Sequence, residues 1–546
     1  MRHAPFPRLI AALALLFACS VTNAEETKHE LSLFEKLEAD GVKIRRIDII
    51  RQPIFNTSNA KQSRWFYRAA NRVHVTTLEK VIAAQLLFKE GEPVSAQAVE
   101  ETERVLRRNS YLYDVSIAAL PAGEGFVDLV VTTRDNWTLF PQLGFSQQGG
   151  QSEYLLGVQE SNLFGTGAEL AASIADDGDR ESKLLTYGNE NFRGSWWRFE
   201  LGFRDSDDGD SARFRLFRPF YSLESRWSAG LDATRLEQEE PLFSFGDEVA
   251  EYRRDQTNAR AFFGWSRGLV DGWARRWTVG IAIDDNQFEP VFEPNRLVVQ
   301  PADREIRYPF IRYEAIEDRF VTATNFTRIA ITEDVFVGRL FSAELGWFGN
   351  TTGSDRDGAI FDLNAAASSG DPTQAVLSVR GRAQGRVEGG DLRNGRFSAT
   401  AGYVRRISDH RSWYVGLEST IAHEADLDAP VQLGGLTGLR GYDRAFANGD
   451  ARAILTAEKR FITDWYPFQL FRVGAAAFVD VGRVWGDDIT GASDDGVLAN
   501  VGLGLRLMST RAASNRMLHI DIAAPVRRDD NVDSSIQVSI QGKRGF

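Results

Sequence analysis

The stretch Ala375–Glu388, AVLSVRGRAQGRVE, decides the fold. Apolar or small side chains such as Leu377 and Val379 alternate along it with polar ones such as Arg380 and Arg382. Because successive residues of a β-strand point to opposite faces, the segment predicts a strand with one apolar and one charged face. Its length suffices for a tilted crossing of a bilayer.

The same alternation recurs in more than a dozen segments after Trp137, joined by turns rich in Gly, Asp, Asn and Ser. Two architectures share this pattern: a soluble β protein with a dry core, and a membrane barrel with lipid outside and water inside. Segment lengths of about 9–11 residues favour the barrel. Only Lys183, Lys459 and Lys543 follow Trp137 while Arg is abundant, which suits arginine–carboxylate networks lining a lumen.

Composition excludes several other classes of protein. The 546 residues are 43% hydrophobic and 26% charged, with 48 Gly and one Cys, which excludes disorder, collagen and a disulfide scaffold. The net charge of −12 argues against a nucleic-acid partner. Scattered histidines and the absence of a nucleotide-binding motif predict no metal site and no cofactor.

The N-terminus has the pattern of an export signal. Arg2 and Arg8 precede the apolar run Leu9–Ala18, and small residues end the segment at Ala24, so residues 1–24 are predicted to be a signal peptide. A competing interpretation takes the residues ending at Cys19 as a lipoprotein box, although Phe17 is bulkier than such a box normally accepts. Residues 25–41 then form a short charged leader, expected to be helical.

Residues 42–136 predict a small α+β domain with a mixed sheet. The expected elements, in chain order, are a strand from Val42, an amphipathic segment Thr77–Phe88, a helix capped by Ser95, and two strands, Tyr113–Leu120 and Phe126–Thr133. Residues 137–546 form the predicted barrel.

Three motifs follow in order: Asn162-Leu163-Phe164-Gly165-Thr166-Gly167, Gly438-Leu439-Arg440-Gly441-Tyr442 and Phe478-Val479-Asp480-Val481-Gly482-Arg483-Val484-Trp485. With the α+β domain they resemble the outer-membrane superfamily that includes BamA, TamA and the two-partner-secretion transporter FhaC. The resemblance implies a mainly β protein, in which one periplasmic POTRA domain precedes a transmembrane antiparallel β-barrel of 16 strands in the outer membrane.

Arg440 is the central residue of the predicted site. Gly438 and Gly441 would let a loop fold back tightly into the barrel, where an arginine is costly unless it meets a carboxylate. The resemblance supplies Asp480 as that partner and gives Tyr442 the aromatic place after the glycine. An isolated motif of this kind would instead be a surface hairpin with a solvated arginine.

The strand count departs from the resemblance. Five alternating segments follow the arginine motif, as the family requires, but about fifteen precede it where the family would have eleven. Some must be strands in loops or strands that we have split, or the barrel is larger. The last segment, Ser535–Phe546, ends on the aromatic residue Phe546, as barrel proteins often do.

No feature of the sequence predicts catalysis. Gly264-Trp265-Ser266-Arg267-Gly268 matches the nucleophile motif of hydrolases, but another alternating segment follows it and not the required helix. The acidic run Asp205–Asp210 could bind Ca²⁺ weakly, although a solvated turn is the better interpretation. The chain is therefore not expected to be an enzyme.

The resemblance implies a barrel that inserts or translocates polypeptides, with membrane lipids, polypeptide clients and periplasmic accessory proteins as partners. The POTRA domain would capture the client, and the barrel would pass it by lateral opening or through the lumen. Lateral opening predicts a weak seam between the first strand, near Leu139–Ser146, and the last, near Ser535–Gln541. Two alternatives stay open: a transporter dedicated to one secreted protein, and a structural or lipid-handling barrel. A passive pore is disfavoured, because the Arg440 loop should obstruct the lumen.

Overall fold

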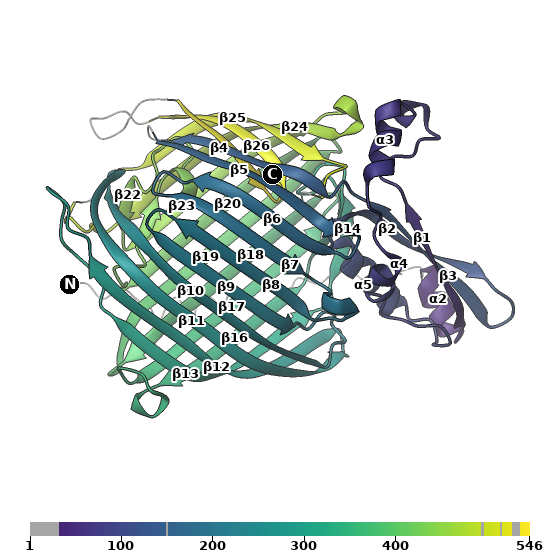
Figure 1. Cartoon of the computed structure of the whole chain (residues 1–546), viewed down its shortest axis with the longest axis horizontal. Coiled ribbons are helices and arrows are strands. Elements are labelled where there is room, and N and C mark those ends of the chain that lie inside the picture. The colour runs from purple at the N-terminus through teal and green to yellow at the C-terminus, as the bar shows by residue number, and fades with distance from the viewer. Residues whose placement is uncertain (1–31, 149–150, 493–495, 514–515, 527–535) are drawn as a thin grey trace.

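A computed structural model describes residues 32–546 except 149–150, 493–495, 514–515 and 527–535. An α+β domain lies at one end of a large closed barrel (Figure 1). We call this the domain end of the barrel and the opposite one the far end. The predicted signal peptide and residues 25–31 of the predicted leader lie outside the described residues.

The N-terminal domain has a three-stranded sheet and four α-helices. Its elements are α2 (Leu33–Ala39), β1 (Lys43–Gln52), the 3-10 helix η1 (Ala60–Gln62), α3 (Trp65–Val73), α4 (Glu79–Ala83), α5 (Ala96–Arg107), β2 (Leu112–Pro121) and β3 (Phe126–Asp135). In the sheet order β1-β3-β2, β3 pairs parallel to β1 and antiparallel to β2. The predicted mixed sheet is thus present.

Local sequence explains the helices of this domain. Ser95 caps α5 as predicted, its hydroxyl accepting a hydrogen bond from the Ala98 N–H. Ser32 and Glu35 form a capping box at the start of α2. Phe34 of α2 packs against the domain core, so this part of the predicted leader is an element of the domain. The amphipathic segment predicted to start at Thr77 shortens to α4, and α3 was not predicted.

Twenty described strands close the barrel. They are β4 (Leu139–Gln148), β5 (Gln151–Leu163), β6 (Ala168–Asp176), β7 (Glu181–Asn189), β8 (Arg198–Ser206), β9 (Gly209–Arg218), β10 (Trp227–Ser244), β11 (Asp247–Val270), β12 (Trp273–Pro290), β13 (Arg304–Glu317), β16 (Arg339–Phe348), β17 (Gly358–Asp371), β18 (Ala375–Glu388), β19 (Asp391–Ser408), β20 (Arg411–His423), β23 (Ala451–Ile462), β24 (Phe471–Trp485), β25 (Leu498–Ser509), β26 (Met517–Pro525) and β27 (Gln537–Lys543).

The expected barrel of 16 strands is therefore wrong. Fifteen wall strands precede the Arg440 loop and five follow it, as counted in the sequence, because the alternating segments before the loop belong to the wall. Of the three explanations for the excess, the larger barrel is correct. Phe546 also differs from expectation, since the last strand ends at Lys543 and leaves Phe546 beyond it.

The outer surface of the wall is apolar and its lumen is charged. Phe263, Val279, Ile311 and Leu345 lie opposite one another on consecutive strands, and all are exposed. Lumen-side pairs join neighbouring strands, such as Arg382 with an Asp362 carboxylate oxygen at 2.6 Å. An exposed apolar belt over a polar lumen is the pattern of a barrel in a bilayer.

Tryptophans mark the domain end of this belt. Trp227, Trp265 and Trp277 are exposed and lie opposite one another on β10, β11 and β12, close to the ends of those strands that face the domain. Trp413 has the corresponding place on β20. Aromatic side chains at this level are typical of the boundary between membrane and water. No helix among the described residues is long and apolar enough to cross a membrane.

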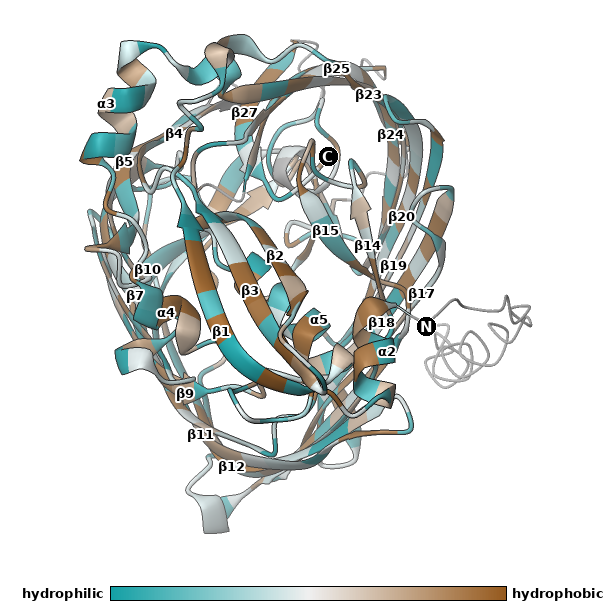
Figure 2. Cartoon of the chain, turned by 90° about the vertical axis from the view of Figure 1, so that its right-hand side faces the viewer, coloured by the Kyte–Doolittle hydropathy of each residue, from teal (hydrophilic) through white to brown (hydrophobic). Residues whose placement is uncertain are grey.

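Two connections between wall strands contain paired strands of their own. At the domain end, the segment between β13 and β16 forms a hairpin of β14 (Phe320–Thr324) and β15 (Thr332–Phe336), here called the rim hairpin. At the far end, residues 424–450 form the lumen loop, with β21 (Val431–Leu433), the 3-10 helix η4 (Gly435–Thr437) and β22 (Ala447–Gly449). Three short 3-10 helices, η2 (Phe192–Gly194), η3 (Asn350–Thr352) and η5 (Pro467–Gln469), lie in other turns. Viewed along the barrel, β1 to β3 and α5 lie across its opening (Figure 2).

Candidate functional site

The lumen loop is fastened to the wall by arginine–aspartate pairs. Arg386 on β18 donates to both carboxylate oxygens of Asp426, at 2.8 and 3.1 Å. Arg304 on β13 donates to both oxygens of Asp428, at 3.1 and 2.6 Å. Bidentate pairs of this kind are strong and hold a defined geometry, so the two pairs fix the start of the loop to β13 and β18.

Arg440 and Asp480 form the third fastening, as the resemblance implied. The Arg440 Nε and Nη2 atoms each lie 2.9 Å from one oxygen of the Asp480 carboxylate. The guanidinium also stacks over the Phe478 ring, 3.3 Å from its centroid. Asp480 accepts two further hydrogen bonds, from Thr456 Oγ1 and Asn500 Nδ2. The solvated surface hairpin is thereby excluded for this motif.

A larger charge cluster surrounds this pair. Arg440 Nη1 lies 3.4 Å from Glu458 and 3.7 Å from Asp521. Arg506, whose side chain is fully buried, contacts Asp521 at 2.5 Å and Glu458 at 3.7 Å, and Arg460 donates to Glu458 at 2.7 Å. The three carboxylates and three guanidiniums balance one another, which is how charged groups are tolerated out of water.

Tyr442 and its neighbouring glycine complete the packing. The Tyr442 hydroxyl donates to the Ala499 carbonyl and accepts from the Ala499 N–H, at 3.0 and 3.1 Å. A Cβ on Gly441 would lie 2.6 Å from the Asn500 Cβ, so a side chain there would push the loop off the wall. Leu433, Leu439 and Phe446 pack with Tyr442 in a buried apolar cluster.

The first motif forms the joint between domain and barrel. Asn162 donates from Nδ2 to Thr77 Oγ1 at 2.8 Å and accepts from the Gly167 N–H at 2.7 Å. Gly165 has φ +72°, and a Cβ there would lie 2.6 Å from the Thr76 carbonyl oxygen. Phe164 is exposed, and Leu163 ends β5. Thr77 is also fixed from the domain side by Asp135.

The domain makes further contacts with the barrel rim. Arg107 donates to both oxygens of Asp334 on the rim hairpin, at 3.0 and 2.7 Å. Glu101 accepts from the Leu223 N–H, in the connection between β9 and β10, at 2.7 Å. Burial raises the pKa of the Glu101 carboxyl above its ordinary value, and that hydrogen bond and Arg104 oppose the rise.

The chain end turns into the barrel and meets the rim hairpin. The Phe546 N–H donates to the Thr327 carbonyl at 2.9 Å, and its ring packs against Ile329, which is fully buried. His519 Nε2 lies 2.8 Å from the Gly545 carbonyl oxygen. The last residues therefore leave the wall and do not continue the final strand along β4.

The seam between β27 and β4 is short. Among the described residues, only Val538↔Gln147, Ser539↔Ser146 and Ile540↔Phe145 pair across it. From Phe145 toward the domain end, residues Leu139–Gly144 pair with β5 but with no described residue of β27. The half of the seam nearest the domain therefore has no ladder.

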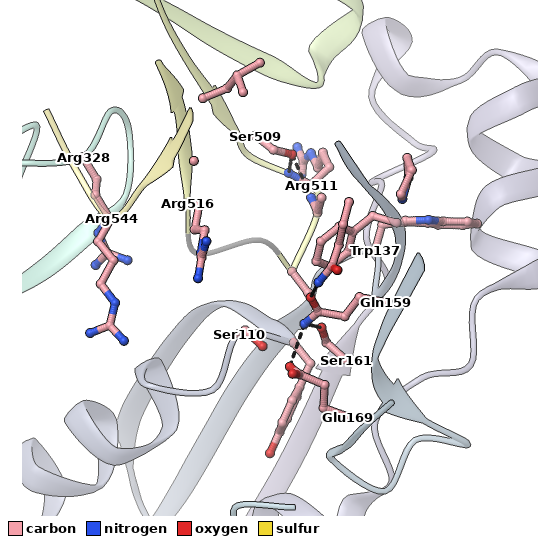
Figure 3. A pocket seen from close by; sticks show the side chains of 18 of the residues that line it. Ser110, Trp137, Gln159, Ser161, Glu169, Arg328, Ser509, Arg511, Arg516 and Arg544 are labelled. Atoms are coloured by element: carbon pink, nitrogen blue, oxygen red, sulfur yellow. Dashed lines mark hydrogen bonds between the residues drawn. The ribbon is translucent and has the colours of Figure 1, made fainter. Parts of the chain in front are cut away.

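A cavity of about 2310 Å³ lies at this open half. Its lining includes inward-facing Gln142 and also Leu143 and Leu505, which are exposed on the outer face, so the cavity reaches through the gap. In Figure 3, Arg516 and Arg544 lie on one side of the cavity. On the other side, Gln159 is hydrogen-bonded to Ser161 and Glu169 (Figure 3).

The other candidate motifs of the sequence make hydrogen bonds within the wall and its turns. Ser266 of the hydrolase-like motif lies within β11, which β12 follows, and its hydroxyl donates to the Arg275 carbonyl. Asp208 of the acidic run accepts from the Glu239 N–H. Within the described residues, no group of three or more His, Cys, Asp or Glu side chains is placed to hold a metal ion.

Sequence reasoning missed the companions of Arg440. These companions, Glu458, Arg506 and Asp521, all lie on the lumen face of their strands. For Asp521, the alternation of apolar and polar residues in Leu518–Ile522 could have predicted that face. The rim hairpin had no such signal, because Phe320–Thr324 and Thr332–Phe336 read like short wall strands.

A family model described as the Omp85 superfamily domain matches residues 162–542. No curated protein is similar enough to match the chain. Similar solved structures include BamA from Haemophilus ducreyi lacking POTRA domains 1–3, with 12% identity, a TM-score of 0.39, and 92% of this chain and 84% of that chain covered. CdiB from Escherichia coli is 13% identical with a TM-score of 0.44, over 91% of this chain and 76% of that chain. CdiB from Acinetobacter baumannii is 12% identical with a TM-score of 0.42, over 98% of this chain and 96% of that chain. Because these TM-scores are low, the family assignment rests on the family model alone.

Proposed function

Because the chain belongs to the Omp85 superfamily of outer-membrane β-barrels, we propose that it inserts or translocates polypeptides at the outer membrane. The α+β domain is a POTRA domain in the periplasm. Its sheet ends in β1 and β2, and an extended client can add to such an edge through main-chain hydrogen bonds. The barrel then passes the client by lateral opening.

The incomplete ladder of the seam carries this proposal. Opening it breaks the three pairs between Val538–Ile540 and Phe145–Gln147, whereas opening elsewhere breaks a full ladder. The cavity at the open half lies between domain residues such as Tyr111 and the strands β4 and β27, so a client leaving the domain meets the seam directly. The free edge of Leu139–Gly144 offers the client a strand to pair with.

The pair of Arg440 and Asp480 acts as a structural lock. It holds the lumen loop against β23 to β26, next to the seam, and keeps this part of the wall rigid while β27 moves. Outer-membrane lipids and periplasmic accessory proteins are the other partners. The step uses no nucleotide, metal or cofactor, and its free energy comes from folding of the client.

Quantitative proteomics of the outer membrane and the culture medium, from a strain lacking this gene, tests the proposal. Depletion of several other β-barrels, restored by the wild-type gene, identifies insertion. Loss of one large secreted or surface protein with barrels unchanged identifies a dedicated transporter. Unchanged protein content with altered lipid content would contradict polypeptide handling and support a lipid-handling barrel.

A further inference from the structure

Helix α3 presents an apolar stripe that no described residue covers. Trp65, Ala69 and Val73 follow one another at helical spacing, and Trp65 and Val73 are 74% and 72% exposed. Phe66 is not part of this stripe, because its ring packs against that of Tyr67 and lines the cavity between domain and barrel. Large apolar side chains in one line on a helix are typical of a surface that binds something apolar.

The opposite face of α3 fixes the orientation of this stripe. Tyr67 is buried, its ring lies 4.6 Å from that of Phe55, and its hydroxyl donates to the Phe468 carbonyl at 2.8 Å. The Asn71 amide both donates to and accepts from the main chain of Phe55. The stripe is therefore held outward by specific contacts.

The helix lies at the edge of the barrel rather than over its opening. Its contact with Phe468 is in the turn between β23 and β24, and Arg511, after β25, donates to the Ile54 carbonyl at 2.8 Å. Trp465 and Phe468 in that turn are 65% and 75% exposed. Figure 2 shows α3 at the periphery of the barrel, beside the turn whose Trp465 and Phe468 are exposed.

The charge around the stripe is positive. Three exposed arginines lie on α3 or at its start: Arg64, Arg68 and Arg72. Arg68 and Arg72 directly precede the stripe residues Ala69 and Val73, so they form a row along one side of the stripe. No acidic residue occurs between Asp48 and Glu79, in a chain whose net charge is −12. An apolar stripe flanked by arginines matches the boundary of acyl chains and phosphates in a phospholipid leaflet.

We propose that α3 is an interfacial helix that binds the phospholipid leaflet at the domain end of the barrel. Trp65 and Val73 enter the acyl boundary, and Arg68 and Arg72 contact lipid phosphates. The bound helix ties the domain to the membrane beside β24 and β25, and so holds the domain at a fixed height below the seam. This inference needs the barrel to span a membrane but does not depend on the identity of the client.

Spin labelling of the full chain tests it. Without Cys19 the chain has no cysteine, so Ala69→Cys gives one labelled position on the stripe. The protein is reconstituted in vesicles of phosphatidylethanolamine and phosphatidylglycerol, and accessibility to oxygen is compared with accessibility to a water-soluble nickel chelate. Leu503→Cys on the barrel wall, 67% exposed, is the lipid reference, and Glu124→Cys in the turn between β2 and β3 is the water reference.

The expected oxygen-to-nickel ratio at position 69 is close to that at position 503 and several-fold above that at position 124. A ratio like that at position 124 would overturn the proposal and leave the stripe to a client or an accessory protein. Helix α3 should bind an anionic leaflet more tightly than a zwitterionic one. In the Arg68→Gln/Arg72→Gln variant, each lost positive charge should reduce this preference roughly fivefold. Equal binding of the parent protein's helix α3 to anionic and to zwitterionic vesicles would overturn the proposed phosphate contacts.

Discussion

The wall at β10 and β11 and the seam between β27 and β4 are built from the same kind of strand but are closed very differently. Strands β10 and β11 pair without a gap from Trp227↔Trp265 to Leu242↔Ala250. Strands β27 and β4 pair only from Val538↔Gln147 to Ile540↔Phe145. Both regions alternate between apolar and polar residues, so the pattern of the side chains is not what separates them.

The difference arises from where the two seam strands end. Beyond Lys543 the chain turns into the lumen, where the rim hairpin holds Phe546. In the register of the three seam pairs, Gln541–Lys543 would lie opposite Gln142–Gly144, but these residues pair with β26 and not with β4. The edge of β4 from Leu139 to Gly144 therefore has no ladder partner there among the described residues. A barrel normally removes its strand edges by closing. Here one edge is kept, and it is kept next to the domain.

Hydrogen exchange should show the largest contrast between the two regions. Local opening sets the exchange rate, so amides of peptide 140–145 should exchange about a hundredfold faster than those of peptide 259–265 on β11. Mass spectrometry of the protein in detergent or nanodiscs measures both peptides in one sample. Equal protection would mean that the seam is as firmly closed as the wall.

Removing the lock should be the most damaging single substitution near the seam. Arg440→Ala leaves Asp480 without its cation and removes one of the three guanidiniums around Glu458, and breaking a buried pair costs about 3–5 kcal/mol. The free energy of barrel unfolding in urea measures the loss, and single-channel recordings should show openings that the parent protein lacks. Arg393→Ala, which breaks the half-exposed pair with Glu424, is the matched control, with an expected cost of at most about 1 kcal/mol. A similar, small effect of both substitutions would argue against a lock.

A substitution at the joint between domain and barrel should have a smaller effect than removal of Arg440. Asn162→Ala removes the hydrogen bonds to Thr77 and to the Gly167 N–H, which should weaken docking of the domain by roughly 1–3 kcal/mol. Distances between spin labels on the domain and on the barrel should then spread over a broader range. Asn364→Ala, on wall strand β17, should leave that distribution unchanged.

The smallest effect expected is a pH dependence of docking. The pKa of Glu101 is raised in the folded protein, so the folded state binds this proton more tightly than the unfolded chain. Its contribution is therefore fully favourable below the ordinary carboxyl pKa of about 4.3 and is lost as pH rises through the raised value. Glu101→Gln should flatten this part of the profile of domain stability against pH. An unchanged profile in that variant would assign the dependence to another group.

Much of the architecture could be predicted from side-chain alternation and from turns. Alternation located the five strands after the lumen loop and the excess before it, and Ser95 located α5. The resemblance placed Arg440 opposite Asp480, and the structure has them in contact. The number 16 failed because it came from the resemblance, whereas the count from the residues themselves was correct.

What could not be predicted depends on contacts between distant parts of the chain. Helix α3 contains aromatic residues and Arg in place of a simple apolar repeat, because one face meets the barrel rim and the other is exposed. The turn of Phe546 into the lumen depends on Thr327, more than two hundred residues earlier. The length of the seam ladder follows from that turn, so no local pattern encodes it.

The most direct test of the central claim is a crosslink across the seam. Phe145→Cys and Ile540→Cys lie directly opposite each other, within the reach of a disulfide. Phe263→Cys and Val279→Cys, opposite each other on β11 and β12, are the matched control in the wall. Each pair is introduced into the strain lacking this gene, and its clients are measured by proteomics under oxidising and reducing conditions. We predict that the oxidised seam pair stops client handling, that reduction restores it, and that the wall pair has no effect. Full client handling with the seam crosslinked would contradict lateral opening.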